Sequence, residues 1–152
     1  MISKILYNPY LQLIARLAIG VLFIFAAIGK IAEPAQFAKE ISNYRLVWEP
    51  LLNIIALIMP WIELIIGLFI LVGFRLRSSS ALASILLMIF IVAVGLAMIQ
   101  GLSINCGCFA KNMAETVGWK KIAENTLSIL VCFYIFKYPI QKLSLEQFVQ
   151  SN

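Results

Sequence analysis

Four long runs of apolar residues, separated by short polar segments, dominate the hydrophobic pattern of this chain. They cover about residues 11–31, 51–74, 80–100 and 117–138. A helix needs about 20 mostly apolar residues to cross the hydrocarbon core of a bilayer. The pattern therefore predicts an all-α membrane protein: a bundle of four transmembrane helices that forms a single integral-membrane domain over residues 1–152.

The fourth run is weaker than the other three. Its first third, residues 120–125 (Lys-Lys-Ile-Ala-Glu-Asn), is polar. The apolar remainder, residues 126–136, would cover only about half of the hydrocarbon core at ~1.5 Å per residue. We therefore expect the polar end of this helix to face protein or a wet cavity rather than lipid.

The segment between the first two runs mixes charged and apolar residues. Phe37, Ile41, Tyr44 and Trp48 recur in it at the spacing of one helix face. This spacing predicts a short amphipathic helix that lies on the membrane interface between spans 1 and 2. Trp48 fits an interfacial anchor, whereas Trp61, within the second run, is expected to pack in the interior.

Composition supports a lipid environment and excludes several chemistries. The chain is 62% hydrophobic and 12% charged, with a mean hydropathy of +0.97. Soluble domains are about half apolar and about a quarter charged. The net charge of +5 comes from basic residues near the ends of apolar runs, where they fit lipid headgroups better than nucleic acid. The sequence has no histidine and no aspartate, which excludes imidazole catalysis and histidine-ligated metal or haem.

Cys106 and Cys108 flank Gly107 in the polar segment between the third and fourth runs. A disulfide between them would stabilise the fold by only on the order of 1–2 kcal/mol, before the strain of so small a ring is subtracted. Strained, exposed disulfides exchange readily with thiols, and the nearby Lys111 favours a thiolate. Thiol–disulfide chemistry is therefore favoured over a clip for a soft metal such as Cu(I) and over two inert thiols. Cys132, in the fourth run, is expected to act as a small hydrophobe.

Four crossings would place both termini on one side of the membrane. Basic residues are nearly balanced between the two sides, but those on the terminal side occupy shorter segments and share them with one acid, Glu146. This distribution favours cytoplasmic termini. The cysteine loop would then be extracytoplasmic, which suits a thiol pair that cycles to a disulfide.

Glu63 lies within the second apolar run. An acid inside a span costs about 2.5–3.5 kcal/mol on insertion scales and needs a partner. We expect Arg16, in the first run, to be that partner across adjacent antiparallel helices. Such a pair either orients the bundle or belongs to a proton or quinone site.

Short motifs along the chain also match a known family pattern. They are Arg16-Leu17-Ala18-Ile19-Gly20 with Phe23, Gly29-Lys30 with Pro34 and Phe37, Asn43-Tyr44, Pro60-Trp61-Ile62-Glu63 with Gly67, and Cys106-Gly107-Cys108-Phe109. Taken together, they resemble the DoxX-like superfamily of four-helix bacterial membrane proteins, particularly its methylamine-utilisation MauE branch. The resemblance covers roughly residues 10 to 138, and Ala110 stands where the family pattern usually has glycine.

The resemblance implies a bacterial cytoplasmic-membrane protein involved in disulfide formation or thiol redox balance outside the cytoplasm. It implies a thioredoxin-like partner, with quinone as one candidate electron acceptor. It nominates Cys106 and Cys108 as the exchanging, catalytic thiols, and Arg16, Lys30 and Glu63 as polar positions of the family pattern. Two alternatives stay open: a non-catalytic membrane anchor or assembly subunit of an oxidoreductase complex, and Cu(I) handling.

Overall fold

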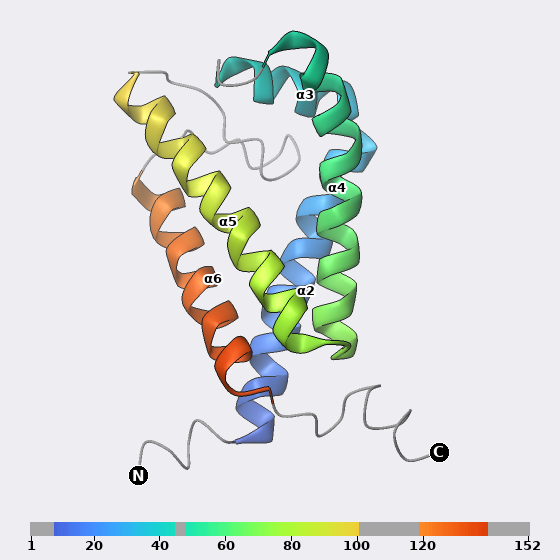
Figure 1. The fold of residues 1–152 in the computed structure, drawn as a ribbon, viewed down its shortest axis with the longest axis vertical. Helices are drawn as coiled ribbons and strands as arrows, with labels where there is room; N and C mark the ends of the chain where they lie inside the picture. The colour runs from blue at the N-terminus through green and yellow to red at the C-terminus, as the bar shows by residue number, and fades with distance from the viewer. Residues whose placement is uncertain (1–7, 45–47, 101–118, 140–152) are drawn as a thin grey trace.

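The computed structural model describes residues 8–44, 48–100 and 119–139, and the regular structure in these ranges is all helical (Figure 1). The helices are, in chain order, α2 (Pro9–Ala32), α3 (Pro34–Asn43), α4 (Glu49–Val72), α5 (Leu76–Ile99) and α6 (Trp119–Lys137). Proline occupies the first turn of α2, α3 and α4, where its fixed φ is already helical and its missing N–H is not needed. The predicted all-α class is confirmed.

The four long helices form two antiparallel pairs. α2 packs along α4, and α5 packs along α6, while α3 lies across the end of the bundle where α2 ends and α4 begins (Figure 1). α5 ends and α6 begins at this same end of the molecule, which we call the α3 end. All five helices can therefore contribute side chains to the α3 end.

Within the ranges that the structure describes, three helices are long and apolar enough to cross a membrane: Pro9–Ala32, Pro50–Val72 and Leu76–Ile99. They confirm three of the four predicted spans, with ends shifted by a few residues. α6 is a helix of 19 residues where the fourth span is predicted, but its charged first turns keep it out of this group.

α3 occupies the place of the predicted interfacial helix but uses its apolar residues differently. Phe37 and Tyr44, which follows the helix, are buried against the bundle, whereas Trp48 is 79% exposed. The apolar face of this segment therefore packs partly on protein, and its place at the membrane surface stays a prediction.

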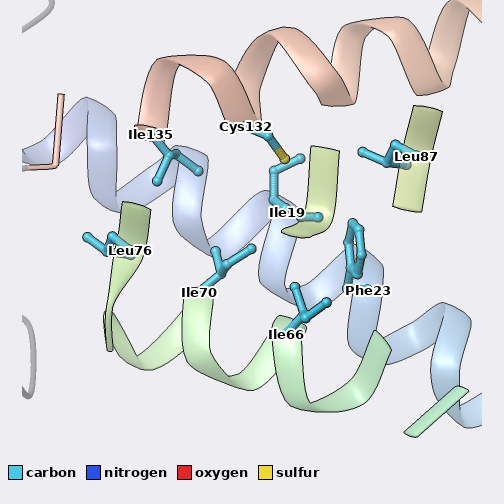
Figure 2. Packing of buried hydrophobic residues seen from close by; sticks show 9 residues of the cluster. Ile19, Phe23, Ile66, Ile70, Leu76, Leu87, Cys132 and Ile135 are labelled. Carbon is cyan, nitrogen blue, oxygen red and sulfur yellow. The ribbon is translucent and has the colours of Figure 1, made fainter. Parts of the chain in front are cut away.

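The core lies where the four long helices meet (Figure 2). Its buried residues are Ile19 and Phe23 of α2, Ile66 and Ile70 of α4, Leu76, Ala83 and Leu87 of α5, and Cys132 and Ile135 of α6. Outside this core, large apolar side chains cover the exposed faces of the helices, as expected of a surface that contacts lipid. Trp61 belongs to that outer surface, because it is 52% exposed, and its predicted interior position is wrong.

Two glycines set how closely α2 and α4 approach. A Cβ added at Gly20 would lie 3.0 Å from the Leu71 Cβ and 3.1 Å from the Gly67 carbonyl oxygen. A Cβ added at Gly67 would lie 3.0 Å from the Phe23 Cβ. Small residues allow this kind of close packing between helices in membranes. The glycine contact also fixes the antiparallel register, with Gly20 level with Gly67.

This register gives Arg16 a different partner from the predicted one. Arg16 is 2% exposed; its Nε donates to the Ile70 carbonyl at 3.2 Å and its Nη2 to the Leu71 carbonyl at 3.1 Å. These carbonyls lie in the last turn of α4, before Gly73 ends the helix with φ 80°. A cation at a helix C-terminus is favourable, and carbonyl groups at a helix end need such partners in lipid.

The predicted Arg16–Glu63 pair is therefore wrong. Side chains on a helix lean toward its N-terminus, so Arg16 leans toward the end of α4 and away from Glu63. Leu71 is the α4 residue at the level of Arg16. It lies about two turns, or roughly 12 Å, further along α4 than Glu63.

We predict that Arg16→Lys lowers the free energy of unfolding by about 1.5–3 kcal/mol, because a lysine ammonium does not reproduce the two-point contact of the guanidinium. Arg77→Lys is the matched control, since Arg77 is exposed in the first turn of α5. Denaturation in mixed detergent micelles measures both. Equal stability of the two variants would show that the helix-end contact contributes nothing.

Candidate functional site

A buried ion pair joins α2 to α4 in the half of the bundle near the α3 end. The Nζ of Lys30 donates to both carboxylate oxygens of Glu63, at 2.6 and 2.7 Å. The two side chains are 9% and 10% exposed. The chain thus satisfies the acid inside the second span with a cation from the last turn of α2. Each charge would be costly without the other, because little water reaches them.

α3 covers the Lys30 side of this pair. The Lys30 ammonium lies 5.0 Å from the centre of the Phe37 ring, a distance at which a cation is attracted to the face of an aromatic ring. Burial raises the pKa of Glu40 on the same helix, against the lowering effects of a hydrogen bond from Gln36 and the charge on Lys30. The α3 end is therefore a partly dehydrated, charged region.

α6 brings a second set of polar groups to the same region. The Lys121 Nζ contacts Glu124 Oε2 at 2.9 Å, and the Ser128 hydroxyl donates to the Glu124 carbonyl at 2.9 Å. Lys121 and Ser128 are buried. Asn125 stands between them, with its side-chain nitrogen buried. The prediction that the polar end of this helix faces protein or a cavity is confirmed for Lys121 and Asn125, whereas Lys120 is exposed.

A cavity connects the two polar sets. It contains about 650 Å³ of space, which includes its open mouth. Its polar lining is Lys30, Glu63, Lys121, Glu124, Asn125 and Ser128, and its apolar lining is Leu22, Phe23, Ala26, Met59, Leu86, Leu87 and Phe90. Pockets with apolar walls and a few converging polar groups are typical ligand sites.

Among the described lining residues the charges balance, with Lys30 against Glu63 and Lys121 against Glu124. The part of the chain that the structure describes contains no group of three or more histidine, cysteine, aspartate or glutamate side chains that could hold a metal ion. Of the three polar residues nominated from the sequence, Lys30 and Glu63 line the cavity, whereas Arg16 contacts the distant end of α4. Lys121, Glu124, Asn125 and Ser128 were not predicted as site residues, although the polar interruption at residues 120–125 signals most of them.

The cysteines divide into two kinds. Cys106 and Cys108 lie outside the described residues, so their proposed chemistry stays a prediction. Cys132 is a free, fully buried thiol in the core between α5 and α6, which confirms its expected role as a small hydrophobe.

The fold and this cavity define an all-helical membrane protein with paired charges inside its bundle. The chain belongs to the MauE family, because the family model described as methylamine utilisation protein MauE matches residues 8–137. The wider DoxX-like placement stays a prediction.

Relatives named methylamine utilization protein MauE support this assignment. The protein of Methylorubrum extorquens is 29% identical over 134 residues, which cover 88% of this chain and 72% of the relative. The protein of Paracoccus denitrificans is 24% identical over 124 residues, which cover 81% of this chain and 67% of the relative. No solved structure matches this chain.

We predict that Lys30→Met lowers the free energy of unfolding by about 3–5 kcal/mol, since it leaves the buried Glu63 carboxylate without its cation. Lys39→Met removes the same charge from an exposed position on α3 and should change stability by less than about 1 kcal/mol. Unfolding in mixed micelles compares the two. A loss no greater than that of the control would contradict a stabilising role for the pair.

Proposed function

We propose that this chain is a membrane-embedded thiol–disulfide exchange protein that acts in methylamine utilisation, the process for which its relatives are named. Cys106 and Cys108 are the exchanging pair, and a thioredoxin-like protein outside the cytoplasm is the partner. The observation that carries the proposal is the position of the two helices that flank the cysteines. α5 ends at Ile99 and α6 begins at Trp119, both at the α3 end of the bundle.

This arrangement limits where the thiols can reach. Cys106 is about seven residues beyond Ile99, and a chain extends by no more than about 3.6 Å per residue. At this limit, Cys106 lies within roughly 25 Å of the end of α5, and Cys108, two residues further on, within roughly 32 Å.

In the proposed topology, α6 is the fourth span. It runs antiparallel to α5, it is apolar over its second half, and Lys121, Glu124 and Asn125 of its first turns line the cavity. α3 then lies at the extracytoplasmic interface, and both termini are cytoplasmic. This topology places the cysteine segment on the oxidising side of a bacterial inner membrane.

The exchange begins when a thiolate of the reduced partner attacks one sulfur of a Cys106–Cys108 disulfide. The S–S bond breaks as a mixed disulfide forms, and the partner's second thiolate then displaces the thiolate of this chain. The partner leaves as a disulfide, oxidised by two electrons, and the pair here becomes a dithiol. A quinone that accepts two electrons and two protons from the dithiol restores the disulfide and becomes a hydroquinone.

A second candidate function is a non-catalytic anchor or assembly subunit of an oxidoreductase complex. The Lys30–Glu63 geometry favours it, because the lysine engages both carboxylate oxygens, as a purely structural pair would. In this case, the function of the protein depends on the bundle and its paired charges and not on the two thiols.

We predict that Cys106 and Cys108 form a disulfide in intact membranes. A membrane-impermeant maleimide added from outside should label both only after reduction, and Cys106→Ser should remove this dependence on reductant. Cys132→Ala is the control, because Cys132 is fully buried and its loss should leave the native labelling unchanged. Labelling of both thiols without reductant, or only from the cytoplasmic side, would contradict the proposal.

The same variants distinguish the two functions. Under the exchange function, Cys106→Ser/Cys108→Ser slows disulfide formation in extracytoplasmic proteins during growth on methylamine. Unchanged disulfide formation together with an intact complex would favour the anchor function.

We predict that exposed positions at the two ends of the bundle lie on opposite sides of the membrane. Lys39→Cys on α3 should react with an impermeant maleimide in intact cells. Arg77→Cys and Lys137→Cys, at the other end, should react only after permeabilisation. The reactions are measured in a Cys106→Ser/Cys108→Ser background. Reaction of Lys137→Cys in intact cells would show that α6 does not return across the membrane.

A further inference from the structure

We propose that the cavity between α2, α4, α5 and α6 binds a neutral, mostly apolar molecule that presents a carbonyl oxygen to the side-chain amide of Asn125. This inference goes beyond the thiol exchange, because it concerns a cavity whose lining, among the described residues, contains no cysteine.

The charge balance of the lining selects a neutral ligand. Lys30 is paired with Glu63, and Lys121 contacts Glu124, so the cavity carries no net charge from these residues. A charged ligand would have to leave water for an apolar site without a counterion, which is unfavourable.

Asn125 requires a hydrogen-bond acceptor. Its Nδ2 is buried and has no hydrogen-bond partner, whereas the neighbouring Ser128 hydroxyl already donates to the Glu124 carbonyl. Buried amide donors are nearly always paired, because an unpaired donor is costly in an apolar environment. Asn125 lines the cavity, so a rotation of its side chain would turn the enclosed Nδ2 toward a carbonyl oxygen of a bound molecule, which would supply the acceptor.

The rest of the wall suits an apolar body. Phe23 and Phe90 contribute flat aromatic surfaces, and Met59 adds a flexible thioether side chain that adapts to irregular ligand shapes. Two sources offer the required chemistry: an aromatic diketone of the quinone type, and a lipid whose acyl chain ends in an ester.

Isothermal titration of the full chain in detergent micelles, with empty micelles as the blank, tests the proposal. Duroquinone is the first probe, and durene, the same ring without carbonyl groups, is its control. Monoolein is the second probe, and its ether analogue without the ester carbonyl is the control. At least one carbonyl-bearing probe should bind about tenfold more tightly than its control. The probe that does so identifies the source.

Asn125→Leu should weaken that binding by about tenfold. Asn53→Leu makes the same change at an exposed position on α4 outside the cavity and should leave it unchanged. If Asn125→Leu does not fold, Ala26→Phe is the second variant, because it fills the cavity and should weaken binding of the probe. Ala18→Phe, on the exposed side of α2, is its control and should leave binding unchanged. Failure of both probes to bind, equal binding of probe and control, or equal effects of the cavity and surface variants would overturn the proposal. The result is independent of whether Cys106 and Cys108 exchange disulfides.

Discussion

The contact between the Lys30 ammonium and the Glu63 carboxylate is the interaction on which the bundle depends. Both charges lie inside helices whose outer faces are apolar, and neither would be tolerated there alone. Because the two residues belong to different helices, the pair can form only when α2 and α4 are adjacent and in the right register. The close contact of Gly20 with Gly67 provides that register.

The same register organises the rest of the molecule. It brings Arg16 to the last carbonyls of α4 at one end, and it places Lys30 under Phe37 of α3 at the other. α5 and α6 complete the core and bring the polar start of α6 to the paired charges. The result is a bundle with an apolar outer surface and a charge-balanced cavity near the α3 end, a place where polar chemistry is possible within lipid.

The hydrophobic pattern predicted the helices well but not the partners of their polar residues. Apolar runs locate helices directly, because length and hydropathy are local properties. The polar start of α6 was expected to face inward, and Lys121 and Asn125 do so. The choice of Arg16 as the partner of Glu63 failed because it relied on depth alone, whereas side chains lean toward the N-terminus of their helix. Lys30 leans toward Glu63, and Arg16 leans away from it. Asn125 was missed since only the packed bundle shows that its amide is buried.

A double-mutant cycle on Lys30→Met and Glu63→Leu, followed by reversible unfolding in mixed micelles, tests the central contact most directly. If the two charges stabilise each other, the double variant loses less stability than the two single variants together. The expected coupling is about 2–3 kcal/mol, the upper part of the range for residues in contact. Additive effects of the two substitutions would contradict the pairing and the register on which the cavity depends.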